Sequence, residues 1–157
     1  MARLTPRFSA NRTVREYTEQ YYLPAAASYR QRAAANGAMG AQLVNWRHAL
    51  EQKWSNLRFG ALKITTDGGK YRFEVQVYLN GLDPNAVRVE LYADGVGDDD
   101  PVRQEMTRGP QLAKANGYIY SARVPSTRPA TDYTPRLIPH RPGVAVPLEA
   151  VRILWQR

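Results

Sequence analysis

The sequence has no cysteine and only two histidines among its 157 residues. Without Cys there is no disulfide framework and no thiolate metal site. His48 and His140 have neither a Cys nor a paired carboxylate at ligand spacing, so we predict no metal site. The N-terminus has no signal-peptide apolar run, and no stretch approaches the ~20 apolar residues of a membrane span. We therefore expect a soluble, cytoplasmic protein without a membrane partner.

The sequence also lacks the short motifs that carry common chemistry. It contains no Gly-x-Ser-x-Gly elbow, no phosphate-binding Walker loop and no Gly-x-Gly-x-x-Gly that opens a helix. The loop 94–100 holds four carboxylates and two glycines, but its spacing differs from that of a calcium loop, and we interpret it as a solvated hairpin loop. We predict no catalytic, cofactor-binding or metal-binding residue in this chain.

Basic residues outnumber acidic ones, 22 to 14, for a net charge of +8. Residues 1–57 hold 8 basic and 3 acidic residues, and residues 58–157 hold 14 and 11. Eighteen of the basic residues are Arg, spread along the chain rather than gathered in runs. Dispersed Arg suits pairing with carboxylates on another protein at least as well as phosphate contacts. Nucleic-acid binding is therefore the less favoured interpretation of the charge.

Helical periodicity dominates the first third of the chain. Val14, Tyr17 and Tyr21 recur at spacings of three and four, which predicts a first helix over residues 9–23. Pro24 predicts a break and a second, Ala-rich helix over residues 24–35.

A third helix is predicted over residues 38–55, after the helix-ending Asn36-Gly37. Leu43, Trp46, Leu50 and Trp54 lie on one face of this helix. Two tryptophans on one stripe need a large apolar partner, which could be a sheet of this chain or a domain outside it.

After residue 57 the period changes to two, which is typical of strands. Residues 70–79 alternate between apolar and polar positions, and Asp67-Gly68-Gly69 predicts a hairpin turn before them. The predicted strands cover residues 58–66, 70–79, 86–94, 102–107, 117–124, 133–139 and 151–156. The expected fold class is α+β, with about three helices over residues 1–57 followed by an antiparallel immunoglobulin-like β-sandwich over residues 58–157.

Tyrosine is abundant, with 10 residues. Tyr78, Tyr92 and either Tyr118 or Tyr120 are predicted on outer strand faces, where an aromatic ring can stack on a sugar or a nucleobase. Tyr packing across neighbouring strands is the more common use of such positions. We therefore keep Tyr78, Tyr92 and Tyr120 as candidates for glucan stacking, as the alternative to a purely structural role.

Two parts of the sequence resemble a known family. Phe8-Ser9-Ala10-Asn11-Arg12-Thr13-Val14-Arg15-Glu16-Tyr17 resembles the Phe-Ser-x-Asp/Asn-Arg-Thr-Ile/Val-x-x-Tyr helix near the C-terminus of glycogen, starch and maltodextrin phosphorylases. Residues 132–140 and 146–155 resemble the end of the bacterial and archaeal α-glucan phosphorylases that carry a C-terminal extension. The resemblance implies that the chain is the C-terminal region of such an enzyme.

The parent enzymes use pyridoxal phosphate on a lysine to cleave α-1,4-glucan with phosphate, which releases glucose 1-phosphate. That lysine and its glycine-rich loops lie upstream of the matched helix, so no catalytic or cofactor residue carries over to this chain. We therefore expect the isolated chain to be inactive and to dock on the missing catalytic domains. Candidate docking residues are Arg12, Tyr17, Tyr21, Trp46 and Trp54, and α-glucan and a second copy of the chain are further candidate partners.

Overall fold

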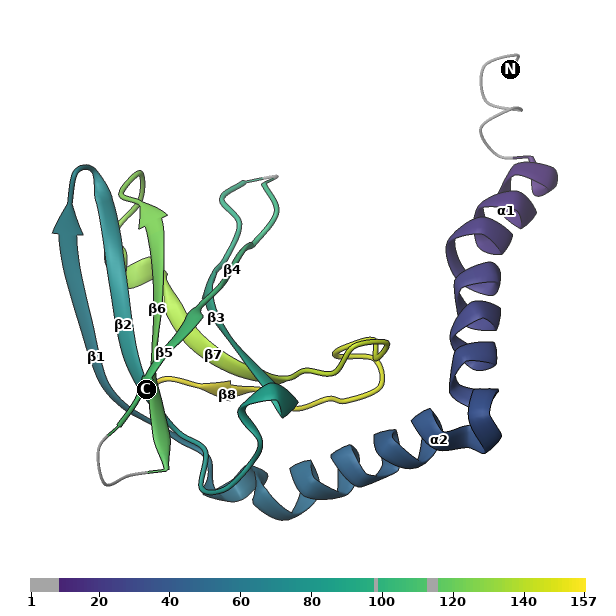
Figure 1. The fold of residues 1–157 in the computed structure, drawn as a ribbon. Helices are drawn as coiled ribbons and strands as arrows, with labels where there is room; N and C mark the ends of the chain where they lie inside the picture. The colour runs from purple at the N-terminus through teal and green to yellow at the C-terminus, as the bar shows by residue number, and fades with distance from the viewer. Residues whose placement is uncertain (1–8, 98, 113–115) are drawn as a thin grey trace. The chain divides into compact units, whose positions relative to one another are not determined.

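The computed structural model describes residues 9–97, 99–112 and 116–157 (Figure 1). Phe8 and Asp98, which belong to the motif and the acidic loop discussed above, lie outside the described residues. The chain divides into two compact units, residues 1–45 and residues 46–157. We call the described part of the first unit, residues 9–45, the helical arm, and the second unit the sandwich.

The helical arm begins at α1 (Ala10–Tyr17) and continues through a π-helical turn, η1 (Thr18–Tyr22), into α2 (Leu23–Lys53). Ser9 caps the start of α1, because its side chain accepts a hydrogen bond from Arg12 N–H at 3.3 Å. The predicted break at Pro24 is wrong. A proline ring clashes with the carbonyl one turn earlier in a regular α-helix, and the wider π turn immediately before Pro24 relieves that clash.

The helix is interrupted at Ala34–Gly37 instead, where the backbone leaves the helical conformation. Ala35, Asn36 and Gly37 all have positive φ, at 50°, 56° and 77°. The predicted end at Asn36-Gly37 is therefore correct. The helical part forms two stretches separated at this point, so the count of three helices is not confirmed.

The described residues of the sandwich form eight strands in two four-stranded antiparallel sheets (Figure 1). One sheet has the order β1-β2-β6-β5 and the other β4-β3-β7-β8. The strand bounds are β1 Arg58–Asp67, β2 Lys70–Tyr78, β3 Val87–Ala93, β4 Val102–Glu105, β5 Thr107–Gln111, β6 Gly117–Pro125, β7 Thr134–Pro139 and β8 Leu154–Trp155. Helices followed by two antiparallel sheets confirm the α+β class.

The strand predicted over residues 102–107 matches β4 as far as Glu105, and the sequence pattern does not predict β5, which follows it. β4 pairs with β3 in one sheet and β5 pairs with β6 in the other, so the chain changes sheets at Met106. The Met106 side chain is buried, and its N–H donates to the Val89 carbonyl at 2.9 Å. The buried Met106 thus holds the crossing point against β3 while the chain passes to the other sheet.

Alternation places the core where the sequence predicts it. Phe73, Val75 and Val77 of β2 are fully buried, as are Val89 and Leu91 of β3. Side chains from the inner faces of both sheets form one buried cluster, which excludes water from the space between the sheets.

The last turns of α2 belong to this core as well. Trp46 and Leu50 are 6% and 2% exposed, and the Trp46 indole N–H donates to the Ala86 carbonyl at 3.1 Å. The second compact unit begins at Trp46, within α2. The period-two signal begins only with β1, so it misses a helical turn that the sheets cover.

Candidate functional site

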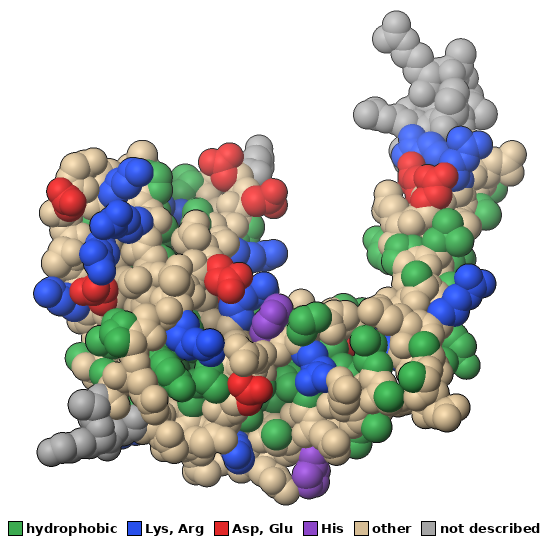
Figure 2. Space-filling model, in the orientation of Figure 1, with side chains coloured by type: hydrophobic (Ala, Val, Ile, Leu, Met, Phe, Trp, Pro, Cys, Tyr) green, Lys and Arg blue, Asp and Glu red, His purple; other side chains and the backbone are tan. Residues whose placement is uncertain are grey.

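Three tyrosines gather on the helical arm, at the junction of α1 and η1. The ring centroid of Tyr17 lies 5.5 Å from that of Tyr21 and 6.5 Å from that of Tyr22. All three residues are more than half exposed, between 52% and 65%. We call these residues the arm tyrosine cluster. Figure 2 shows the hydrophobic side chains of the arm on its surface in green.

The arm continues this apolar surface on both sides of the cluster. Val14 and Leu23 are 64% and 59% exposed. Arg12 forms an ion pair with Glu16 at 2.7 Å, and both side chains are nearly half exposed. An exposed pair of this kind contributes at most about 1 kcal/mol, so Arg12 stays available to exchange Glu16 for another carboxylate.

The two tryptophans predicted for docking lie in the sandwich. Trp46 is buried in the core, so it cannot contribute to a docking surface in the folded chain. Trp54 is half-buried and packs against the core, and the Arg152 guanidinium lies 6.0 Å from its ring centroid. Of the predicted docking residues, Arg12, Tyr17 and Tyr21 remain on the surface.

A second group of aromatic rings lies on the outer face of the β4-β3-β7-β8 sheet. Tyr92 of β3 and Trp155 of β8 meet edge to face at 5.4 Å. The Arg136 guanidinium of β7 lies 4.3 Å from the Tyr92 centroid and 5.5 Å from that of Trp155. We call these three residues the sheet-face cluster. The strand register brings these side chains together, because Arg136 of β7 lies opposite Trp155 of β8 on one side and opposite Glu90 of β3 on the other.

A buried ion pair holds Arg136 in place. Glu90 is 5% exposed and accepts hydrogen bonds from Arg136 Nε and Nη2 at 3.0 and 2.8 Å. Arg88 Nη2 approaches the other Glu90 oxygen to 2.9 Å. Two guanidinium groups therefore share one carboxylate, which compensates the cost of burying its charge.

The tyrosines predicted for stacking do not form one surface. Tyr92 is half-buried on the outer face of its sheet, and a hydrogen bond to Asp94 raises the pKa of its hydroxyl. Tyr78 lies on β2 in the other sheet, with the Arg58 guanidinium 4.1 Å from its ring. Tyr120 is 4% exposed, and burial raises the pKa of its hydroxyl. Its ring is not available for stacking.

Trp155 is the aromatic residue that sequence reasoning misplaced. Alternation over residues 151–156 puts it on the same side as Val151 and Ile153 and predicts a core position. In the structure β8 is only Leu154–Trp155, Trp155 is 36% exposed and Val151 is 81% exposed. A two-residue strand is too short for its alternation to be informative.

Basic side chains gather on the outer face of the β1-β2-β6 sheet (Figure 2). Arg72 of β2 lies directly opposite Arg123 of β6, and Lys63 of β1 is opposite Glu74. Arg72 pairs with Glu74 at 2.8 Å, so part of this charge is compensated.

No group of three or more His, Asp or Glu side chains able to hold a metal ion occurs among the described residues. In the described part of the chain, no helix has the length and apolar content of a membrane span.

Residues 54–157 match the sequence profile of the glycogen phosphorylase C-terminal domain. The chain belongs to this family. The matched region begins at a short 3₁₀ turn, η2 (Trp54–Asn56), and takes in β1 to β8, so the family corresponds closely to the sandwich.

Curated relatives extend the match to the helical arm. A glycogen phosphorylase of Mycobacterium tuberculosis is 32% identical over 154 residues, which cover 90% of this chain and 18% of that protein. A glycogen phosphorylase of Mycobacterium bovis is 31% identical over the same length. A maltodextrin phosphorylase of Thermococcus litoralis is 29% identical over 121 residues, 74% of this chain and 14% of that protein. The chain thus spans less than a fifth of the length of these relatives.

Proposed function

We propose that this chain is the non-catalytic C-terminal part of an α-glucan phosphorylase and that its helical arm docks on the catalytic domains of that enzyme. The parent reaction would be phosphorolysis of α-1,4-glucan to glucose 1-phosphate. The proposal rests on the arm tyrosine cluster, an exposed aromatic surface on a segment that also matches the glycogen phosphorylases. The pyridoxal phosphate of the parent enzyme would be held upstream, by residues outside this sequence.

The chemistry of the arm favours a protein partner. Fully burying one large apolar side chain is worth roughly 1.5–3 kcal/mol, so three tyrosines and their aliphatic neighbours could supply most of the affinity of a stable interface. Tyrosine suits an interface centre because its ring is apolar and its hydroxyl can still find a partner. Arg12 would add a charged contact at the edge of this surface.

Dye binding and light scattering test whether this surface is free in the isolated chain. We expect the chain to bind 8-anilinonaphthalene-1-sulfonate and to self-associate with rising concentration. The double variant Tyr17→Ser/Tyr21→Ser should reduce both effects. Tyr29→Ser is the matched control, because Tyr29 is 73% exposed on the same arm and outside the cluster. A strictly monomeric chain that binds no dye contradicts the proposal.

Docking itself is tested in trans. The chain is mixed with its parent phosphorylase truncated before the region that corresponds to residue 9, and the complex is measured by size-exclusion chromatography with light scattering. Tyr17→Asp/Tyr21→Asp should abolish complex formation, while Tyr29→Asp should leave it unchanged. Equal binding by both variants would show that the arm docks elsewhere, if it docks at all.

For the fold, we propose that the sandwich is immunoglobulin-like. In that fold one sheet has the strand order A-B-E-D, and the other contains C, F and G, to which variable-type domains add a strand beside C. Assigning β1, β2, β6 and β5 to A, B, E and D reproduces the first sheet. Assigning β4, β3, β7 and β8 to the added strand, C, F and G reproduces the second.

A second candidate function is α-glucan binding by the sheet-face cluster. The supporting observation is that Tyr92 and Trp155 lie side by side on one face, where a pyranose ring could stack on them. Affinity electrophoresis in glycogen gels tests this idea. Trp155→Ala should restore free migration, while Tyr78→Ala, on the opposite sheet, should remain retarded. Unretarded migration of the wild-type chain at high glycogen concentration excludes glucan binding.

A further inference from the structure

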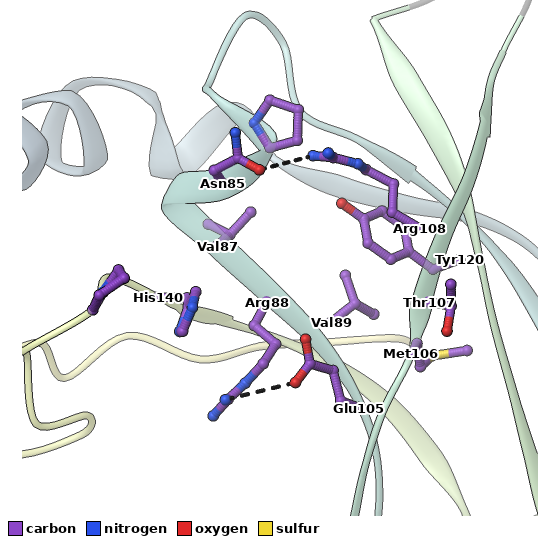
Figure 3. A pocket seen from close by; sticks show the side chains of 12 residues that line it. Asn85, Val87, Arg88, Val89, Glu105, Met106, Thr107, Arg108, Tyr120 and His140 are labelled. Atoms are coloured by element: carbon purple, nitrogen blue, oxygen red, sulfur yellow. Dashed lines mark hydrogen bonds and ion pairs between the residues drawn. The ribbon is translucent and has the colours of Figure 1, made fainter.

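The strand switch at Met106 leaves a notch in the side of the sandwich. β4 covers only the Glu90–Ala93 part of β3, and the chain then leaves for the other sheet as β5. Beside the uncovered start of β3 lies a pocket of about 590 Å³, and we use the word notch for this pocket from here on (Figure 3). This volume falls within the ~300–1,000 Å³ typical of sites for small organic ligands.

One end of the notch carries an uncompensated positive charge. Arg108 Nη1 donates to the Asn85 side-chain oxygen at 3.3 Å, and the guanidinium also interacts with the Tyr120 hydroxyl. Both partners are neutral, and no carboxylate pairs with Arg108 in the part of the chain that the structure describes. Figure 3 shows these three side chains converging at the same end of the pocket.

The opposite end is polar but nearly neutral. Arg88 lies between Glu90, at 2.9 Å, and Glu105, at 3.8 Å. Its Nε is enclosed by protein and has no hydrogen-bond partner among the described residues. His140 lines the same end. The charged side chains that line the notch are Arg88, Arg108 and Glu105, so its lining has an excess of one positive charge.

The pocket also has an apolar lining. Val87, Val89 and Met106 are at most 4% exposed, so the apolar side chains that a ligand can reach are Pro84, which is half-buried, and Pro142, which is exposed. A ligand with a charged head and an apolar or weakly polar body would therefore contact both kinds of surface. A bare inorganic ion would leave most of the volume to water.

We propose that the notch binds a small organic anion, a carboxylate or a phosphate ester. Arg108, with Asn85 and Tyr120, holds the acid group. The body of the ligand lies against Pro84 and Pro142 toward the Arg88–Glu105 pair. The arginine fork suits either kind of acid group, because it donates two parallel hydrogen bonds. This site shares no residue with the arm tyrosine cluster, so it can exist whether or not the arm docks on catalytic domains.

The test titrates the chain with four probes and follows the side-chain Nε–Hε signals of arginine by NMR. Phenyl phosphate and benzoate present the two acid groups on one apolar body, and inorganic phosphate and acetate present them without it. We expect saturable shifts with phenyl phosphate, benzoate or both, at least about tenfold tighter than with the matching bare anion, because the body buries apolar surface. The tighter of the two organic probes identifies the acid group.

Two variants and a control make the assignment specific. Arg108→Ala should weaken binding of the tighter probe at least about tenfold, the loss expected for one charged hydrogen-bond donor. Glu105→Gln should tighten it about twofold to threefold, because it removes the exposed negative charge at the far end. Arg123→Ala is the matched control, since Arg123 is an exposed arginine of the neighbouring strand β6 outside the notch.

Three results would overturn the proposal. One is the absence of a saturable shift below about 50 mM, where nonspecific ion pairing begins to dominate. Another is equal weakening by Arg108→Ala and Arg123→Ala, which would indicate general charge attraction. The third is binding of acidic peptides with no response to either organic probe, which would make the notch a protein contact rather than a small-molecule site.

Discussion

Trp46→Ala distinguishes a core role for this tryptophan from a docking role. The helical stripe of Trp46, Leu50 and Trp54 needs an apolar partner, either a sheet of this chain or another domain, and the structure buries Trp46 between the last turns of α2 and the sheets. If the burial is correct, the substitution weakens the sandwich itself. If Trp46 were a docking residue, the isolated sandwich would tolerate the change.

The expected magnitude follows from burial and hydrogen bonding. Removing a buried Trp or Phe side chain typically costs about 3–5 kcal/mol, part of it from the cavity left behind. The substitution also leaves the Ala86 carbonyl without the indole N–H at 3.1 Å, although the His140 N–H still donates to it at 2.9 Å. We therefore expect about 3–4 kcal/mol for Trp46→Ala, with little added cost from the lost hydrogen bond. Trp46→Phe should cost about half as much.

Urea denaturation followed by circular dichroism measures this loss. With a slope of about 2 kcal/mol per molar urea, a loss of 3–4 kcal/mol lowers the midpoint by roughly 1.5–2 M. Tyr29→Ala is the control, because an exposed side chain should change stability by no more than about 0.5 kcal/mol. A shift below 0.5 M for Trp46→Ala would refute the burial of Trp46, and the sandwich would then begin later in the chain.

Three further substitutions test other parts of the sandwich. Arg136→Ala removes one of the two partners of buried Glu90 and should lower the free energy of unfolding, measured by urea denaturation, by about 3 kcal/mol. Adding Glu90→Gln should recover part of this loss. No loss of stability would mean that Arg88 alone satisfies Glu90. Gly117→Ala would place a Cβ 2.8 Å from the Val77 carbonyl oxygen and should cost about 1–3 kcal/mol, whereas Gly40→Ala, with nothing nearer than 3.8 Å, should be neutral or stabilising. Burial raises the pKa of Tyr120 above 10.0, so the folded state holds this proton more tightly than the unfolded state. The resulting stability is present below the ordinary tyrosine pKa and is lost as pH rises through the folded-state value. Tyr120→Phe should therefore flatten the decline of the urea midpoint above about pH 10, and an unchanged decline would show that other tyrosines cause it.

Regular alternation made most of the sandwich predictable. The strand predicted over residues 70–79 matches β2 (Lys70–Tyr78), because its apolar positions all face the core and its polar positions all face outward. The turn at Asp67-Gly68-Gly69 was equally readable, since Gly68 and Gly69 both have positive φ in the structure. Both features are encoded by residues that are adjacent in sequence.

The strand switch could not be predicted from the same pattern. Residues 102–107 are predicted as one strand, because nothing in their side chains marks Met106 as the point where hydrogen bonding passes from β3 to β6. Which strand accepts each half depends on partners far away in sequence. The notch beside β3 cannot be predicted either, since Arg88, Arg108 and His140 line one pocket only after both pairings form.

The sheet-face cluster has the same origin. Tyr92, Arg136 and Trp155 come from three strands, and the register of β7 against β3 and β8 brings them together. A prediction from local pattern places each residue on a face but assigns it no neighbour. The sequence pattern therefore predicts that Tyr92 faces outward, but it does not predict the contact with Trp155.

The helical arm and the end of α2 show most clearly that a local sequence pattern does not identify the partner of an apolar face. Tyr17 and Tyr21 recur with the same helical spacing as Trp46 and Leu50, so periodicity assigns both pairs to an apolar face. In the structure the first pair is more than half exposed and the second is at most 6% exposed. Helical spacing identifies a face that needs a partner, but it does not say whether the partner is in the same chain. Replacing the side chains of the two pairs by alanine should therefore have different consequences. For Tyr17 and Tyr21 we expect weaker association with an unchanged free energy of unfolding. For Trp46 and Leu50 we expect a lower free energy of unfolding.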